Sequence, residues 1–201
     1  MIKLLIFDFD GVLRLWNDAL ITEREKELGL PEGSVFSAAF RHEDYLQAIT
    51  GEIEDPHWRE KTLARLEAEH GPASRDLMDT WNKLEGDLDH EMLALVRSLR
   101  RQARVVLLSN NTSRLEEDMA RMGLLEELDH IYNTSRVGIA KPDARVYEHI
   151  LQAEGVRPEE TVFIDDLRSN IEAAAAIGIH AHHYEGIEDL KQFLAGLGLQ
   201  A

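Results

Sequence analysis

An apolar run ends on two carboxylates in Leu4-Leu5-Ile6-Phe7-Asp8-Phe9-Asp10-Gly11, and this segment sets the architecture of the chain. A short apolar run of this kind is typical of a strand that is buried on both faces of a parallel sheet. In three later segments, apolar residues are also followed directly by polar ones. They are Val105-Val106-Leu107-Leu108-Ser109-Asn110, Gly138-Ile139-Ala140-Lys141-Pro142 and Val162-Phe163-Ile164-Asp165-Asp166.

These polar groups are expected to meet at one edge of a sheet. In open α/β proteins, ligands bind beyond the carboxyl ends of the strands. Three of the four segments have the form of strands that stop at a carboxylate or a hydroxyl, and the fourth sets a lysine on a turn. The groups that folding would gather are Asp8, Asp10, Ser109, Lys141, Asp165 and Asp166. Such a set can hold a divalent cation beside a phosphate and can offer a carboxylate nucleophile.

Most of the remaining chain alternates between strand and helix patterns. The expected strands are 2–7, 105–109, 161–164 and 179–184, and the expected helices are 113–122, 142–154, 168–177 and 187–194. Strands separated by helices of about ten residues imply a parallel sheet with right-handed crossovers. The predicted fold class is therefore α/β, with a Rossmann-like parallel sheet as its core.

Residues 14–87 interrupt this alternation, because they contain no strand-like run. Amphipathic helices are expected there at about 17–28, 41–50, 56–70 and 74–85. Asp55 is the expected N-cap of the third helix, Pro56 its first residue, and Gly71 the residue after its end. The sequence thus predicts two domains, a Rossmann-like core of residues 1–13 and 88–201 and an inserted small all-helical cap domain of residues 14–87.

Composition restricts the class of protein. The 201 residues suffice for one substantial domain with an insert, and a 44% hydrophobic share supplies a core. Without cysteine, the chain has no disulfide or thiolate chemistry. It has no apolar run of eighteen or more residues and no signal-peptide pattern. We therefore expect a cytoplasmic protein without a membrane helix.

The net charge of −16 argues against nucleic-acid binding, which requires a basic surface. It does not exclude an anionic substrate, because a bound cation is usually the largest charge in its site. Residues 14–87 contain nine basic and seventeen acidic residues and show no evident second phosphate site. Single arginines within this segment, such as Arg14, Arg41 or Arg59, are candidates for a contact with the substrate.

Taken together, the four segments resemble the haloacid dehalogenase-like (HAD) superfamily of hydrolases, in the branch with a small helical cap after the first motif. The resemblance rests on Asp8-Phe9-Asp10-Gly11-Val12, Ser109-Asn110, Lys141-Pro142 and Asp165-Asp166, in this order. A lone Asp-x-Asp would have little weight, whereas the ordered set is specific. The resemblance covers nearly the whole chain, although the cap matches only in length and helical character.

This resemblance implies a phosphoric monoester hydrolase and a role for each motif. Asp8 is expected to attack phosphorus and form an aspartyl-phosphate. Asp10 is expected to protonate the leaving alkoxide and later to activate water. Lys141 would place its charge on the phosphoryl group and on Asp8. Ser109 and Asn110 would hydrogen-bond the phosphoryl group, and Ser109 is also a candidate cap for the following helix.

The resemblance also implies Mg²⁺ as cofactor, an ion that prefers oxygen ligands in octahedral geometry. The implied ligands are Asp8, the backbone carbonyl of Asp10, and Asp166. Adjacent carboxylates such as Asp165 and Asp166 repel each other, so a buried pair favours a cation. The residues alone leave either aspartate as the direct ligand. The resemblance favours Asp166, with Asp165 as its orienting partner.

The expected reaction is Mg²⁺-dependent hydrolysis of a small phosphorylated metabolite beneath a cap that excludes bulk water. The sequence identifies neither that metabolite nor the oligomeric state. Trp16, Trp58 and Trp81 are expected to pack in or beneath the cap, and a stacking role toward substrate has no support in the sequence.

Three alternatives remain open at this level. A sugar phosphomutase resembling β-phosphoglucomutase would share the core but would need a second phosphate site. A haloacid dehalogenase is disfavoured, because those enzymes resemble this fold but lack an aspartate at the position of Asp10. A noncatalytic binding or regulatory protein on a HAD scaffold is disfavoured by the complete set of catalytic residues.

Overall fold

The computed structural model describes residues 1–200 and is built around a five-stranded parallel sheet. The strands lie in the order β5-β4-β1-β6-β7. Their bounds are β1 (Leu4–Phe7), β4 (Arg104–Ser109), β5 (His130–Asn133), β6 (Thr161–Asp165) and β7 (His180–His183). The α/β class predicted from the sequence is confirmed, and the four expected strands form, together with β5.

Helices cover both faces of this sheet. One face packs on α6 (His90–Leu99), α7 (Leu115–Arg121) and α11 (Ile187–Gly196), and the other on α9 (Ala144–Glu154) and α10 (Arg168–Ala176). Successive residues of β1 alternate between the two layers, with Leu5 and Phe7 in one core and Leu4 and Ile6 in the other. All four are fully buried, which explains the continuous apolar run.

The strand order reverses at β1, and this places the site. From β1 the chain reaches β4 and β5 on one side, and then crosses to β6 and β7 on the other. Phe7 pairs with Leu107 of β4 and with Ile164 of β6, so these three strands end side by side. A ligand crevice is expected outside the carboxyl ends of the strands at such a switch point.

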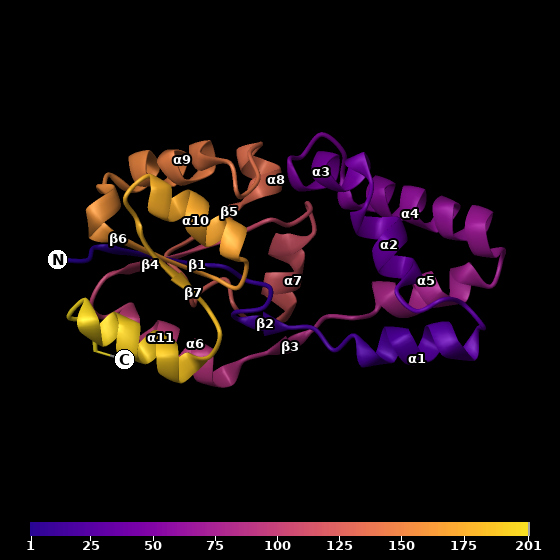
Figure 1. Cartoon of the computed structure of the whole chain (residues 1–201), viewed down its shortest axis with the longest axis horizontal. Helices are drawn as coiled ribbons and strands as arrows, with labels where there is room; N and C mark the ends of the chain where they lie inside the picture. The colour runs from indigo at the N-terminus through magenta and orange to yellow at the C-terminus, as the bar shows by residue number, and fades with distance from the viewer. Residues whose placement is uncertain (201) are drawn as a thin grey trace.

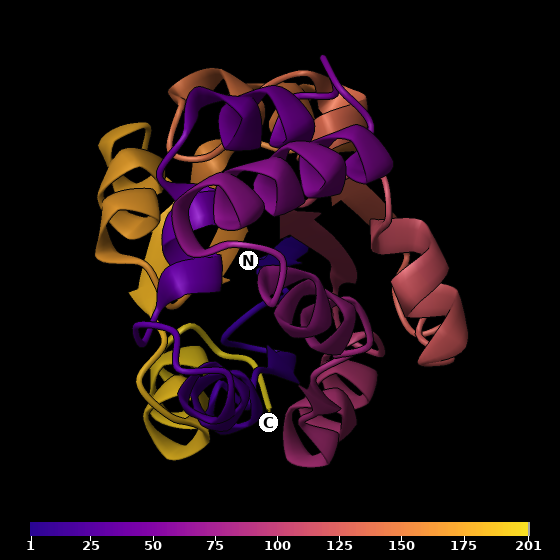
Figure 2. The same cartoon turned by 90° about the vertical axis from the view of Figure 1, so that its right-hand side faces the viewer.

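A separate group of helices lies beyond that edge of the sheet (Figures 1 and 2). These cap helices are α1 (Ala19–Glu27), α2 (Ser34–Phe40), α3 (Glu43–Ile49), α4 (Asp55–His70) and α5 (Ser74–Asn82). They have apolar clusters of their own, one of which includes the buried Ile21, Leu66 and Leu77. The division of the chain at 13/14 and 87/88 stays a prediction, although the cap and core each have a distinct apolar interior.

Several local expectations were wrong. Residues 14–87 are not free of strand, because β2 (Arg14–Leu15) pairs antiparallel with β3 (Asp87–Leu88) where the chain enters and leaves the cap helices. Asp55 is the first residue of α4 rather than its N-cap, and Pro142 precedes α9, whose cap is Asp143. Three helices were not expected, namely α2, α6 and α8 (Thr134–Val137), and Pro158–Glu160 forms a 3₁₀ turn.

Among the described residues, none of the helices combines the length and the apolarity that are needed to span a bilayer.

Candidate active site at the carboxyl edge of the sheet

Asp8 is the first residue after β1 and is held firmly at the end of the strand. Its backbone N–H donates to the carbonyl of Ile164 at 2.9 Å, which continues the sheet register. Its Oδ1 accepts from the backbone N–H of Phe9 at 2.7 Å and lies 2.7 Å from Lys141 Nζ. Both contacts use Oδ1, so Oδ2 is the oxygen left for chemistry. Burial raises the pKa of Asp8 well above its usual value, although the charge of Lys141 opposes this.

Lys141 lies between two carboxylates. Its Nζ is 2.7 Å from Asp8 Oδ1 and 2.7 Å from Asp165 Oδ2, and it donates to the carbonyl of Leu108 at 3.1 Å. The ammonium group is thus fully buried and fully bonded. Burial alone would lower the pKa of Lys141, but the charges of Asp8 and Asp165 raise it above its usual value. The lysine therefore stays charged in the interior.

The turn that presents this lysine is fixed by Asn110. The backbone N–H of Lys141 donates to Asn110 Oδ1 at 2.8 Å, and Asn110 Nδ2 donates back to the Lys141 carbonyl at 2.9 Å. The side-chain amide of Asn110 therefore holds Lys141, a role different from the expected contact with phosphate. Ser109 is buried at the end of β4, opposite Asn133 of β5.

Asp165 and Asp166 are adjacent but have different surroundings. Asp165 is completely buried, and it accepts from the backbone N–H of Leu167 at 2.8 Å and from Asn170 Nδ2 at 2.9 and 3.0 Å, in addition to Lys141. Asp166 is only half-buried, and burial followed by the charge of Asp165 raises its pKa. Asp165 is thus committed to internal contacts, whereas Asp166 faces the rim.

The structure brings Asp8, Asp165 and Asp166 together, with one carboxylate oxygen of each within 4.8 Å of the others. Lys141 supplies one positive charge against three carboxylates, and the pKa values of Asp8 and Asp166 are raised, so a cation would offset the negative charge when all three are ionised. The donor atoms are hard oxygens, as Mg²⁺ requires. Gly11 makes this arrangement possible, because its φ is +80° and a Cβ there would lie 2.3 Å from Asp166 Oδ2.

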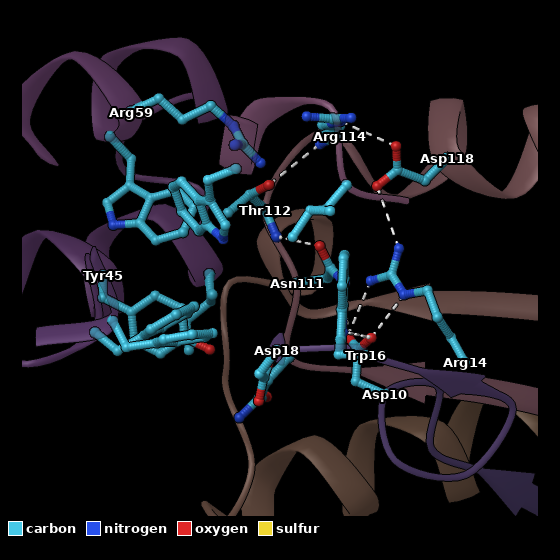
Figure 3. Close-up of a pocket in the computed structure, with 17 residues that line it drawn as sticks. Asp10, Arg14, Trp16, Asp18, Tyr45, Arg59, Asn111, Thr112, Arg114 and Asp118 are labelled. Carbon is cyan, nitrogen blue, oxygen red and sulfur yellow. Dashed lines mark hydrogen bonds and ion pairs between the residues drawn. The ribbon is translucent and has the colours of Figure 1, made fainter. Parts of the chain in front are cut away.

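The side chain of Asp10 does not join this cluster and instead faces the cap (Figure 3). Its two oxygens accept from Arg14 Nε at 2.7 Å and from Arg14 Nη2 at 3.0 Å. Trp16 Nε1 donates to Asp10 Oδ1 at 2.7 Å, and Asn111 Nδ2 donates to Asp10 Oδ2 at 3.2 Å. Because these donors hold the carboxyl group away from the carboxylate cluster, only the backbone carbonyl of Asp10 remains for the metal contact that the resemblance implies, while the carboxyl group lines the cavity.

A cavity of about 220 Å³ lies between the cap helices and the carboxyl edge of the sheet. Core residues supply mainly polar groups and the cap supplies mainly aromatic ones (Figure 3). The core lining is Asp10, Asn110, Asn111, Thr112, Arg114 and Asp118, and the lining from residues 14–87 is Arg14, Trp16, Asp18, Phe36, Phe40, Tyr45, Ile49, Trp58, Arg59, Trp81 and Leu84. Arg14 and Arg59 thus reach the cavity as expected of candidate contacts, whereas Arg41 does not line it.

Cap and core are joined beside this cavity by Asp55. Thr112 Oγ1 donates to Asp55 Oδ2 at 2.7 Å, and the backbone N–H of Asp55 donates to Ser113 Oγ at 3.0 Å. Arg59 Nε donates to the other carboxylate oxygen of Asp55 at 2.7 Å. The N-terminus of α4 is therefore bonded to the loop that follows β4, which fixes the cap over the site.

Sequence reasoning missed several residues that shape the site. Asn170 holds Asp165, Asn111 contacts Asp10, and Arg114 and Asp118 form an ion pair of 2.9 Å in the cavity wall. Asn170 lies on the turn of helix that directly follows the Asp165-Asp166 pair, which is a usable signal. The pattern gives no such signal for the ion pair, because it depends on the relative placement of helices.

Comparison with known proteins identifies the family. The family model for haloacid dehalogenase-like hydrolases matches residues 2–178. The sesquiterpene phosphatase astK of Aspergillus oryzae is 29% identical over 186 residues, which cover 90% of this chain and 89% of the relative. The D-ribitol-5-phosphate phosphatase of Bacteroides thetaiotaomicron is 24% identical over 202 residues, which cover 96% of this chain and 97% of the relative.

Solved structures share the fold. The HAD family enzyme bt-2542 of Bacteroides thetaiotaomicron, crystallised with magnesium and inorganic phosphate, superposes with a TM-score of 0.76 at 24% identity. The alignment covers 94% of this chain and 99% of that one. Some sequence relatives are much longer, and the chain spans 17% of one and 35% of another.

Proposed function

The chain belongs to the haloacid dehalogenase-like hydrolases, and from that premise we propose that it is a Mg²⁺-dependent phosphatase of a small phosphorylated metabolite. The observation that carries the proposal is the setting of Asp8. Its Oδ1 is held by Phe9 and Lys141, and Oδ2 remains as the nucleophile. The phosphatase names of two relatives that cover nearly their whole length support the same reaction.

In the first step, Asp8 Oδ2 attacks phosphorus, and a P–O bond to Asp8 forms as the ester P–O bond breaks. The leaving alkoxide takes a proton from Asp10, whose carboxyl group faces the cavity where the alcohol would lie. Lys141 stabilises the negative charge beside Asp8, because it is buried and held at 2.7 Å. Ser109, at the end of the neighbouring strand, is assigned to the phosphoryl oxygens.

In the second step, Asp10 takes a proton from water, and the water oxygen attacks the phosphorus of the aspartyl-phosphate. This breaks the bond to Asp8 and releases inorganic phosphate. Arg14 and Trp16 hold the Asp10 carboxyl group at the cavity in both steps. The polar side of the cavity thus performs proton transfer, while the cap excludes bulk water.

The residues present fit a magnesium ion. Asp8, Asp166 and the backbone carbonyl of Asp10 would hold it, and Asp165 would orient Lys141 and not ligate, because its oxygens already accept several donors. When bound, Mg²⁺ would neutralise charge on the phosphoryl oxygens. The three clustered carboxylates support this assignment.

The decisive experiment replaces the nucleophile. Asp8→Asn keeps the shape of the side chain but removes the charged oxygen, so phosphate release from any ester should fall to background. Asp76→Asn, on the exposed surface of α5, is the matched control and should retain full activity. Circular dichroism should show both variants folded. Turnover well above background in folded Asp8→Asn would refute the covalent mechanism.

A further inference from the structure

We propose that the leaving group of the substrate is apolar and carries no second phosphate or carboxylate, so that the enzyme cleaves phosphate monoesters of hydrophobic alcohols. The inference deepens the proposed function and rests on it. It follows from two properties of the cavity, namely the aromatic wall that the cap contributes and the pairing of its arginines.

The aromatic wall consists of Phe36, Phe40, Tyr45, Trp58 and Trp81, which come from α2, α3, α4 and α5. Phe40 is its centre, with ring centroids 4.9 Å from Tyr45, 5.7 Å from Trp58, 6.2 Å from Trp81 and 5.8 Å from Phe36. Although Phe40 belongs to this cluster, 39% of its surface stays accessible. An aromatic group that lines a cavity and is left uncovered favours an apolar occupant.

This wall extends to the reacting groups. Tyr45 belongs to the aromatic wall and lines the same cavity as Asp10. Trp16, which also lines the cavity, donates from its ring nitrogen to Asp10 at 2.7 Å. A leaving group whose oxygen meets Asp10 would therefore have its carbon skeleton against aromatic rings from its first atoms onward (Figure 3).

The cations of the cavity are already neutralised. Three arginines line it, and each is bonded to a carboxylate at 2.7 to 2.9 Å; the pairs are Arg14 with Asp10, Arg59 with Asp55, and Arg114 with Asp118. Because the charge of each arginine is already balanced, a second anionic group on the substrate would bring an uncompensated negative charge beside these carboxylates, which is costly in a buried site. The cavity therefore lacks the second phosphate site that a phosphomutase needs.

The relatives differ in the alcohols that their names give, a sesquiterpene in one and ribitol in the other. A polyol such as ribitol would need hydrogen-bonding partners where this cavity presents the faces of aromatic rings. The apolar wall therefore separates the two classes of alcohol for this chain. The terpenoid class is thus the better match in chemistry.

Two matched pairs of esters test the inference, each with primary alcohols as leaving groups so that intrinsic reactivity is equal. The first pair is 3-phenylpropyl phosphate and ribitol 5-phosphate, and kcat/KM should be at least about tenfold higher for the phenylpropyl ester. The second pair is hexyl phosphate and hexane-1,6-diol bisphosphate, and the bisphosphate should be the poorer substrate. Equal values within a pair, or preference for ribitol or the bisphosphate, would overturn the inference.

Variants locate the preference in the aromatic wall. Phe40→Ala and Trp81→Ala should each lower the phenylpropyl-to-ribitol ratio of kcat/KM about fivefold or more. Leu46→Ala is the control, because Leu46 is exposed on the same cap and does not line the cavity. It should leave the ratio unchanged. If neither Phe40→Ala nor Trp81→Ala changes the ratio from its wild-type value, the inference is contradicted.

Binding of a nonhydrolysable analogue separates this inference from the proposed function. 3-Phenylpropylphosphonate should bind wild-type protein in a calorimetric titration with Mg²⁺, and Phe40→Ala should weaken it about fivefold. If no ester is hydrolysed, the proposed function fails, and this titration alone then decides the inference. If a polyol phosphonate binds the wild-type protein with the same affinity as 3-phenylpropylphosphonate, the inference is overturned.

Discussion

Lys141 shows how a single side chain determines the charge balance of the site. Its ammonium group is buried at 2.7 Å from Asp8 and 2.7 Å from Asp165. A buried ion network contributes to stability only while each charge keeps its partner. The lysine thus has two roles, because it holds Asp8, the proposed nucleophile, in place and it offsets the repulsion between two buried carboxylates.

We predict that Lys141→Met abolishes phosphate release and lowers the free energy of unfolding by about 3–5 kcal/mol, because Asp8 and Asp165 lose their buried counter-charge. Urea unfolding monitored by circular dichroism measures the loss. Lys191→Met is the control, since Lys191 forms its ion pairs on the surface. Stability equal to that of Lys191→Met would show that the buried pairs contribute nothing.

Arg14 positions Asp10, the proposed general acid. Its guanidinium lies 4.3 Å from the Phe9 ring centroid and 4.5 Å from that of Trp16, and it binds both oxygens of Asp10. This stacked, two-pronged geometry is specific to arginine. The ion pair therefore fixes the direction in which Asp10 can deliver a proton.

Loss of this positioning should depend on the leaving group. We predict that Arg14→Met lowers kcat for an alkyl phosphate about 100-fold, because a misplaced catalytic group is that costly. p-Nitrophenyl phosphate should be affected much less, since its leaving group needs no proton. Arg14→Lys should recover part of the loss on the alkyl ester. Equal losses on both esters would indicate a structural role only.

At the residue scale, the sequence predicted which polar groups share the edge but not all of their contacts. Asp8, Lys141 and Asp165 meet because three parallel strands and one turn end together. The sequence could not show that Asp10 turns toward Arg14, or that Asn110 binds the backbone of Lys141. Those contacts depend on side-chain directions that strand periodicity does not determine.

At the scale of elements, two of the contacts between cap and core lie at the ends of cap helices. One is the bonding of Asp55 to Thr112 and Ser113. The other is the turn after α3, where a Cβ on Gly51 would lie 2.0 Å from the carbonyl oxygen of Ser135 in α8. Glycine is thus required at position 51 for close approach as well as for its φ of +77°.

We predict that Gly51→Ala disturbs cap closure and lowers kcat/KM for large substrates more than for small ones, because remote contacts position large leaving groups. Gly29→Ala is the matched control, since Gly29 also has a positive φ, +69°, but has open space around its Cβ position. Both variants suffer backbone strain, so thermal unfolding should show a loss in each. Kinetics should separate them, and equal activity in the two would refute a role of Gly51 in closure.

Most elements with long apolar stripes or buried apolar runs were predicted, although α6 was missed despite its buried apolar stripe, and the short α2, α8 and β5 were not predicted. The helix at 56–70 was expected and α4 extends from Asp55 to His70. The helix α2 has seven residues and begins after Gly33, which offers no side-chain cap. The strand β5 reads His-Ile-Tyr-Asn, and its position at the edge of the sheet permits this polar content. Asp55 was expected to cap α4, but the tertiary contact with Thr112 uses its carboxylate instead.

At the scale of the whole molecule, a chain of net charge −16 is proposed to bind an anionic phosphate. On that proposal, a cation would have to offset the clustered carboxylates before substrate can approach. We predict that Mg²⁺ raises the free energy of unfolding, by about 2.7 kcal/mol at a concentration 100 times its Kd. Thermal unfolding with Mg²⁺ and with chelator measures this effect.

The stabilisation by Mg²⁺ should disappear in Asp166→Asn and persist in Asp76→Asn, which lies outside the site. Activity should be lost in chelator and restored by added Mg²⁺. Full activity of a thoroughly chelated sample would contradict the metal assignment.

The stability of the fold should also depend on pH through His182, on the edge strand β7. Its ring is buried and stacks on Phe193 of α11, with centroids 4.6 Å apart. Burial lowers the pKa of His182. The charges of Asp189 and Glu185 oppose this lowering, and the charge of His183 adds to it. The folded protein thus favours the neutral ring, and the unfolded chain takes up the proton first. The contribution to stability is present above the ordinary histidine pKa of about 6.5 and is lost as pH falls below it.

We therefore predict that the free energy of unfolding decreases between pH 7.5 and 5.5, and that His182→Phe makes this decrease smaller. Phenylalanine keeps the stacking on Phe193 but cannot take up a proton, so it removes the linkage without opening a cavity. His180→Phe is the control on the same strand, because the His180 ring is partly exposed and bonds only the carbonyl of Glu159. Urea unfolding at several pH values gives the slopes. If His182→Phe and wild type decline in parallel, the acid sensitivity of the fold has another origin.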